Sequence, residues 1–318
     1  MTKYIIRRLL QTIPVLLGVS ILVFSLMYFI PGDPARIMAG EGASPQTIEN
    51  LREKLGLNDP AYVQYGRYLS NALQGDLGNS VRSGRPVMDE IQVRFWTTVE
   101  LSVYATILAV FLGLIAGIIS AVRHYTLSDI SIMIVALFGL SMPNFWLGLL
   151  LIQWFAIGNI PFIDTNLPEF LRMRPSGWDE SWRQMVLPVI TLGTGGAAII
   201  ARMTRSSMLE VIDQDYIRTA RAKGVSERLV IYKHALKNAL IPVVTVIGLE
   251  FGGFLGGAVL TETIFAVNGM GRLTIDAIRQ RDFPIVQGTV LVISVLFVFV
   301  NLLVDISYRF LNKRIDLN

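Results

Sequence analysis

The sequence of 318 residues contains no cysteine and only two histidines, and both facts limit the chemistry open to the chain. Without cysteine the chain can form neither a disulfide bond nor a thiolate metal site. His124 and His234 lie far apart in the sequence, and neither lies near a glutamate at the spacing of a zinc protease motif. Both fall beside the expected ends of apolar segments, so we interpret them as interfacial residues and not as metal ligands.

Motifs for covalent chemistry are also absent from the sequence. ATP hydrolysis would require a glycine-rich loop that ends in Gly-Lys-Ser or Gly-Lys-Thr, and no such loop occurs. The stretch Gly193-Thr194-Gly195-Gly196 lacks the lysine and lies in an apolar segment, so we interpret it as flexible or tightly packed helix. No apolar segment carries a Gly-x-Ser-x-Gly elbow. We therefore predict that the chain is not an enzyme and has no catalytic residue.

Charge is scarce as well, at 16% of residues against 53% hydrophobic residues, which is too apolar for an ordinary water-soluble domain. The apolar residues form uninterrupted runs close to the thickness of a bilayer. The run at 130–158 contains Pro143, where a kink or a break is tolerated in a packed bundle. We predict an all-α integral membrane protein, one transmembrane domain over residues 1–318 with six spans. The expected spans are residues 9–30, 98–122, 130–158, 185–203, 239–261 and 285–308.

Lysine and arginine residues predict the orientation of these spans. If there are six spans, four basic groups fall on one side of the membrane, and short loops rich in Lys and Arg stay in the cytoplasm. Both termini are therefore expected in the cytoplasm, with loops at about 31–97, 159–184 and 261–284 outside. The four groups are Lys3, Arg7 and Arg8; Arg123; Arg202, Arg205, Arg218, Arg221, Lys223, Arg228, Lys233 and Lys237; and Arg309, Lys313 and Arg314.

The outer loop at 31–97 is long enough to fold. Ser44 is expected to cap a helix that begins at Pro45 and stops at Gly56, and a second helix is expected at 62–73. Two interpretations of this loop remain open. It is either a solvated cap over the bundle or a docking surface for an external partner.

Small residues recur at every fourth position in two spans. Such stripes allow the backbones of neighbouring helices to approach closely in lipid, and they also leave faces that can slide or rotate as units. We favour the packing role. The stripes are Ala109, Gly113, Gly117 and Ala121 in one span, and Gly248, Gly252 and Gly256 in the other, with Gly253 and Gly257 on an adjoining stripe.

Glu250 is an ionisable residue inside an expected span, which makes it a functional candidate. It either lines the translocation path, where it would meet a cationic group of the substrate, or fixes contacts between helices as a neutral or paired group. Glu100 and Asp305 lie at span ends and can reach interfacial water.

The loop at 204–238 contains the pattern of a short, slim helix. Asp215 is expected to cap it, Ala220 and Ala222 keep it narrow, and Gly224 is suited to the left-handed conformation at its end. Ser226 is expected to start a second helix that runs to about residue 238. A rigid helical knob at the membrane surface suits insertion into a cleft on a soluble partner.

This loop resembles the cytoplasmic coupling loop of ABC importer permeases, in which Glu-Ala-Ala is followed by a glycine three residues later. The chain departs from that motif at Arg218 and Thr219, which precede Ala220, in the manner of the dipeptide and oligopeptide permease branch. Further stretches that look like landmarks of that branch are Tyr4-Ile5-Ile6-Arg7-Arg8-Leu9-Leu10, Pro31-Gly32-Asp33-Pro34, Leu55-Gly56-Leu57, Gly75-Asp76-Leu77-Gly78, Ser141-Met142-Pro143, His234-Ala235-Leu236-Lys237-Asn238-Ala239 and Glu262-Thr263-Ile264-Phe265.

The resemblance implies the six-helix bundle of a type I importer permease in the cell membrane. It further implies a second homologous permease, two ATPase subunits that bind ATP and Mg, and an extracytoplasmic binding protein that delivers di- or oligopeptides. The resemblance implies that this chain binds no cofactor and no nucleic acid. The residues that the resemblance assigns to coupling with the ATPases are Asp215, Tyr216, Arg218, Thr219, Ala220, Arg221, Ala222, Lys223 and Gly224.

Other functions remain as alternatives. The same machinery could import glutathione, nickel chelates or oligosaccharides, because selection rests largely with the binding protein. If the chain were an ATP-independent secondary transporter, we would expect charged pairs or broken half-helices near the bilayer centre. In the sequence only Glu250 fits that expectation. A membrane-bound enzyme would need a convergent set of nucleophile, base or metal ligands. A purely structural scaffold leaves the family landmarks unexplained.

The expected topology can be tested with Gln64→Cys and Glu227→Cys, because the chain has no native cysteine. A membrane-impermeant maleimide added to intact cells or right-side-out vesicles should label Gln64→Cys alone. Glu227→Cys should react only after the membrane is permeabilised. Labelling of both positions from the same side would contradict the topology.

Overall fold

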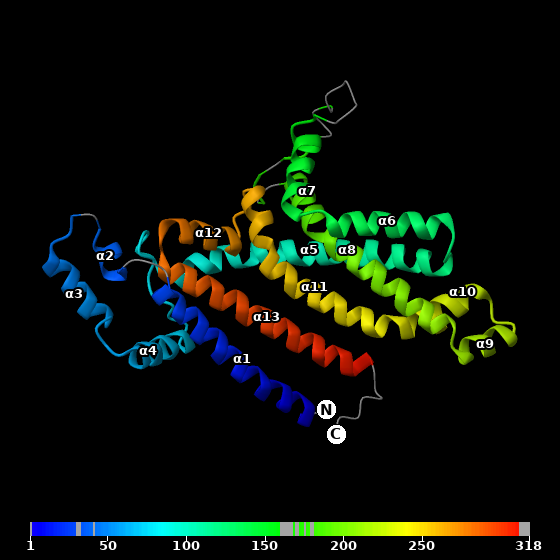
Figure 1. Cartoon of the computed structure of the whole chain (residues 1–318), viewed down its shortest axis with the longest axis horizontal. Coiled ribbons are helices and arrows are strands. Elements are labelled where there is room, and N and C mark those ends of the chain that lie inside the picture. The colour runs from blue at the N-terminus through cyan, green and yellow to red at the C-terminus, as the bar shows by residue number, and fades with distance from the viewer. Residues whose placement is uncertain are drawn as a thin grey trace. The chain divides into compact units, whose positions relative to one another are not determined.

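A computed structural model describes residues 2–29, 33–40, 42–159, 168, 172–174, 176–178 and 181–311 (Figure 1). Most of the expected loop at 159–184, together with Pro31, Gly32, Lys313 and Arg314, lies outside the described residues. Within the described residues the structure is helical, with one isolated β-bridge between Asn79 and Pro86. The all-α class predicted from the sequence is therefore confirmed.

Contacts within the chain group its residues into two compact units. The first unit comprises residues 1–98 and 268–298, and the second comprises residues 99–267 and 299–318. Helices α5 (Val87–Val122) and α13 (Phe283–Leu311) contribute residues to both units.

Five helical segments are long and apolar enough to cross a membrane. They are α1 (Thr2–Phe29), α5, α8 (Trp182–Ile212), α13, and the continuous helical stretch Glu227–Ile264, which ends in α11 (Leu236–Ile264). A sixth span arises if α6 (Leu127–Ser141) is joined to the segment Asn144–Ala156, which comprises α7 (Asn144–Leu151) and the π-helical turn η1 (Ile152–Ala156).

The sixth segment is bent by 101° between its two parts. Pro143 causes the break, because proline has no N–H to donate to the preceding turn and forces the residue before it out of the helical region. Met142 accordingly has ψ 126°, and α7 restarts directly after Pro143. Of the kink or break expected at Pro143, the structure has the break.

Helix α8 lies at the centre of the second unit. It packs against α6, α7 and α11, and it shares an apolar core with α5 that includes Leu101, Leu192, Ile200 and Phe254. Among the spanning helices of the described chain, its apolar window has the lowest mean hydropathy, 1.6, and the largest buried share, 56%. A helix surrounded by other helices exposes little surface to lipid, so it needs fewer large apolar residues.

Glycines let α5 and α8 approach each other closely. A methyl group on Gly117 would lie 2.6 Å from the carbonyl oxygen of Ala201, and one on Gly113 would lie 2.9 Å from that of Ala197. Both distances are shorter than any real contact of a Cβ atom. The packing role predicted for this stripe is confirmed.

The glycine stripe of α11 is only partly used. Gly248 packs against Val304 of α13, at a distance that leaves no room for a Cβ atom. Nothing in the described residues lies within 4 Å of a Cβ built on Gly253, Gly256 or Gly257. This part of the stripe therefore forms an open face on the chain.

The first unit contains α2 (Pro34–Ala39), α3 (Pro45–Leu55), α4 (Ala61–Leu73) and α12 (Met270–Gln280). Helix α3 begins as predicted, because the Ser44 hydroxyl accepts a hydrogen bond from the N–H of Thr47 at 3.1 Å. It also ends as predicted, at Gly56 with φ 65°. The second helix of this loop, α4, begins at Ala61.

Gly117→Val should destabilise the chain by about 1–3 kcal/mol, because the added atoms overlap a backbone carbonyl that cannot move without shifting α8. Gly256→Val is the matched control, since it makes the same helical substitution where space is open. Thermal unfolding of the isolated chain in mild detergent checks the difference. Equal melting temperatures for the two variants would contradict the close approach.

Candidate functional site

The loop after α8 folds into a short helix, α9 (Asp215–Ala222), followed by α10 (Glu227–Leu229) and the π-helical turn η3 (Val230–Ala235) (Figure 1). Ile217 is fully buried at the base of α9. It packs in one apolar cluster with Ala121 of α5, Met208 of α8 and Val230 of η3. We call these residues, with Ile231, Ala235 and Ala239, the α9 seat, because they hold α9 against α5, α8, η3 and α11.

Polar contacts fix the ends of α9. The Arg221 guanidinium donates two hydrogen bonds to Glu227 on α10, at 2.7 and 3.1 Å, and this carboxylate raises the pKa of Arg221. The Asn238 amide donates to the Tyr216 hydroxyl at 2.7 Å. Helix α9 is therefore tied both to α10 and to the start of α11.

The two ends of α9 differ in how well they were predicted. The expectation that Asp215 caps the helix is wrong. Gln214 occupies the N-cap position, and the Asp215 carboxylate lies 3.5 Å from Arg218. At the other end Gly224 has φ 76°, a left-handed conformation that glycine adopts without the steric cost paid by other residues.

Most of the residues that the sequence assigns to coupling are brought together on the exposed side of α9. Ala220 is the exception, since it is half-buried and packs against the α9 seat. The exposed side carries three cationic residues and one carboxylate, which suits protein docking. The exposed residues are Asp215, Tyr216, Arg218, Thr219, Arg221, Ala222, Lys223 and Gly224.

Glu250 lies elsewhere on α11. It is 12 residues beyond Asn238, or about 18 Å along the helix at 1.5 Å per residue. Its side chain is half-buried, and its Oε2 lies 3.2 Å from the position of a Cβ built on Gly196 of α8. The carboxylate thus faces the glycine-rich stretch of α8, far from α9.

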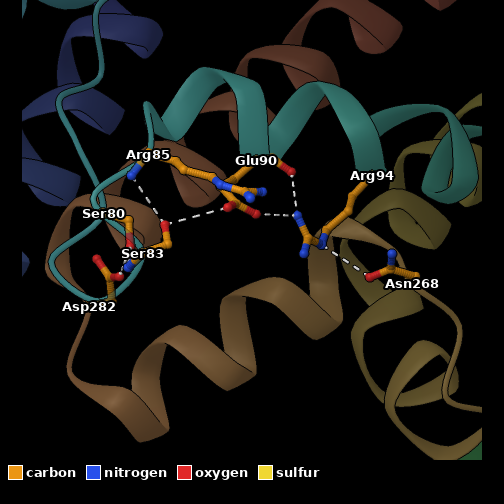
Figure 2. Close-up of polar contacts among 7 residues, drawn as sticks. All are labelled: Ser80, Ser83, Arg85, Glu90, Arg94, Asn268 and Asp282. Atoms are coloured by element: carbon orange, nitrogen blue, oxygen red, sulfur yellow. Dashed lines mark hydrogen bonds and ion pairs between the residues drawn. The ribbon is translucent and has the colours of Figure 1, made fainter.

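A polar network in the first unit was not recognised from the sequence (Figure 2). The buried carboxylate of Asp282 accepts hydrogen bonds from the Ser80 hydroxyl at 2.5 Å and from the N–H groups of Val81 and Arg82 at 3.2 and 3.3 Å. Asp282 directly precedes α13, so it fixes the turn at 80–83 against the junction of α12 and α13.

The same network continues along the start of α5. Arg94 donates to the Glu90 carboxylate at 2.6 Å and to the Asn268 side chain at 3.1 Å, as Figure 2 shows. An aspartate just before a helix that has proline in its first turn is a recognisable start signal. That signal could have identified Asp282 as a capping residue, but nothing in the sequence indicates its partners about 200 positions away.

A cavity of about 460 Å³ lies in the first unit. The Tyr68 hydroxyl is buried without a hydrogen-bond partner among the described residues, and burial raises the pKa of Tyr68 to about 12. The cavity wall is largely apolar, with amide and guanidinium groups between the apolar residues. Its lining includes Phe24, Leu51, Leu55, Gln64, Arg67, Tyr68, Asn71, Phe283 and Gln287.

No group of three or more His, Asp or Glu side chains in the described ranges is arranged to hold a metal ion. The polar groups instead hold helices and turns together.

Two family models together match almost the whole chain. Residues 113–317 match the binding-protein-dependent transport system inner membrane component, and residues 1–102 match the N-terminal region of the same membrane component. The chain belongs to this family. It is a permease subunit of an ABC importer and not an ATPase, which confirms the class predicted from the sequence.

Curated relatives match over their full length. The chain is 48% identical to the dipeptide transport system permease protein DppB of Alkalihalophilus pseudofirmus, over 99% of each chain. It is 46% identical to the glutathione transport system permease protein GsiC of Escherichia coli strain K12, again over 99% of each chain.

Solved structures confirm the fold of an importer permease. The MetNI methionine ABC transporter in an inward-facing conformation aligns with a TM-score of 0.55 at 19% identity, over 71% of this chain and 97% of that chain. An amino acid ABC transporter crystallised with histidines aligns with a TM-score of 0.52 at 15% identity, over 76% and 97%.

Proposed function

We propose that the chain translocates di- or oligopeptides across the cell membrane and that α9 couples this movement to ATP hydrolysis on partner ATPase subunits. The observation that supports the coupling role is the α9 seat. Because α9 has a polar exposed side and a fully buried Ile217, a soluble partner that moves α9 would also move the helices packed against it.

The proposed substrate class rests on the two relatives. One is named for dipeptide transport and the other for glutathione transport, and their identities to this chain, 48% and 46%, are nearly equal. Both names denote small molecules that contain amide bonds and bear charged termini. Glutathione therefore remains the second candidate substrate.

The proposed partners each have a surface on the chain. ATPase subunits would dock on α9. The open glycine face at Gly253, Gly256 and Gly257 suits a second permease, because small residues allow close helix packing in a membrane. A binding protein would dock on the folded loop that contains α3 and α4.

The proposed topology follows from the basic residues. Six spans form one transmembrane domain, with both termini and α9 on the cytoplasmic side and with α3 and α4 outside. ATP-driven closure of the ATPases would move α9, and the α9 seat would carry that movement into α5, α8 and α11. The helix bundle would then expose its substrate path to alternate sides of the membrane.

Co-purification of the tagged chain in mild detergent tests the assembly. A second permease and ATPase chains should remain bound, and a binding protein should stimulate ATP hydrolysis by the complex. Recovery of this chain alone, still able to transport peptides in liposomes without ATP, would instead support a secondary transporter.

In that complex, Ala220→Arg should lower ATP-dependent peptide uptake by about tenfold or more, because a long charged side chain cannot fit against the α9 seat and displaces α9. Ser206→Arg is the control, since it adds the same charge at an exposed position of α8. Uptake in proteoliposomes and ATP hydrolysis are measured together. Normal uptake by Ala220→Arg would contradict the coupling role of α9.

Glu250→Gln should change the relative uptake of peptides with a free and with an acetylated N-terminus, because a path-lining carboxylate attracts the cationic amine. Glu210→Gln, an exposed substitution on α8, serves as the control. Competition assays in proteoliposomes give the ratio. An unchanged ratio would make Glu250 a packing residue.

A further inference from the structure

A second buried carboxylate, Asp129, joins three helices of the second unit. Its two oxygens accept hydrogen bonds from Nε and Nη2 of Arg205 on α8, at 2.8 and 2.7 Å. The Ser120 hydroxyl of α5 donates to the same carboxylate, and so does the N–H of Tyr125 at 2.9 Å. The Asp129 side chain is 4% exposed.

This carboxylate also shapes the turn between α5 and α6. Tyr125 has φ 61°, a left-handed conformation that is costly for a residue other than glycine. The hydrogen bond from its N–H to Asp129 helps to hold that conformation. The turn and the first residues of α6 are thus built around one side chain.

A surface groove lies where Asp129 and Arg205 meet. The groove has a volume of about 400 Å³ and is lined by Ile130, Met133 and Ile134 of α6. Leu127, at the start of α6, is 82% exposed. The bidentate ion pair bridges α6 and α8 beside this groove, and α5 and α8 approach each other closely at Gly113 and Gly117.

The pair lies at the level of the α9 seat. Ser120 is the neighbour of Ala121 on α5, and Arg205 lies one turn before Met208 on α8. Ala121 and Met208 both contact the cluster that holds Ile217. The helix ends that bind Asp129 are thus the same ends that support α9.

We propose that Asp129 and Arg205 are positioning residues that make α6 move as one body with α9, α5 and α8. This inference rests on the proposed coupling role of α9. A movement of α9 reaches α5 and α8 through the α9 seat, and the bidentate ion pair extends it across the groove to α6. Bidentate Arg–carboxylate pairs suit this role, because two parallel hydrogen bonds fix orientation as well as distance.

Loss of either Asp129 or Arg205 should strongly weaken the attachment of α6 to α8. Removing the guanidinium leaves a buried carboxylate with one side chain and one backbone donor, and such an uncompensated charge is unfavourable. Arg205→Lys keeps the charge and a hydrogen-bond donor but loses the planar, bidentate geometry. It should therefore restore part of the link that Arg205→Gln removes.

The test measures whether α6 and α9 keep a fixed distance. Spin labels on Leu127→Cys and Gln214→Cys, both exposed positions, report the distance between α6 and the start of α9 by double electron–electron resonance in the purified complex. The wild-type background should give one narrow distance distribution that does not change between the nucleotide-free and vanadate-trapped states. A label pair between Gln214→Cys and an ATPase subunit confirms that trapping has occurred.

Arg205→Gln should broaden the distribution and lower the peptide transported per ATP hydrolysed by about tenfold. Arg202→Gln, an exposed substitution one turn away, should change neither, and Arg205→Lys should give intermediate values. A wild-type distance that changes on trapping would overturn the proposal. So would a narrow distribution with normal coupling in Arg205→Gln.

Failure of the proposed function has a different signature. A wild-type complex without ATP-dependent uptake would remove the importer mechanism. The spin-label distance distributions of wild type and Arg205→Gln without nucleotide would still show whether the ion pair holds α6 in place. Equally narrow distributions for the two proteins would contradict the proposal that the ion pair fixes α6.

Discussion

The close approach of α5 and α8 at Gly113 and Gly117 is the contact on which the second unit depends. In a bilayer, helices gain little by burying apolar side chains from lipid tails, so association relies on packing of backbones that come close together. Helix α8 can then occupy the centre of the unit with small residues, while larger residues of its neighbours fill the space around it. Within the second unit, the α9 seat includes residues of α5, α8 and α11, and Glu250 of α11 faces α8.

The sequence was sufficient for the helical class and for the helix signals of α3, because these depend on local composition. Ser44, Pro45 and Gly56 act within one or two turns of the chain, and each does in the structure what its chemistry predicts. At Pro143 the sequence allowed either a kink or a break. Its angle depends on how α7 packs against α8 and α11, and that information is not local.

Helix α9 could be located from the sequence, but the residues of the α9 seat that hold it could not. Gly224 and the alanines indicate a short helix, whereas the burial of Ile217 depends on residues of α5, α8 and η3 that are distant in the chain. The same reason explains why Asp129 and Asp282 were missed. Arg205 was noticed as a basic residue near a membrane surface, but its partner is 76 positions away, and no spacing rule joins residues so far apart.

The π-helical turn η3 at Val230–Ala235 sets the rotational phase between the two ends of the stretch Glu227–Ile264. A π turn holds one residue more than an α turn would, so it rotates everything that follows by about 100° relative to a regular helix. Relative to Glu227, Glu250 therefore lies about 100° from the position that a regular α-helix would give it. Glu250 faces Gly196 of α8, so the side of the helix that Glu227 occupies at the other end of this stretch is offset from the side that packs on α8.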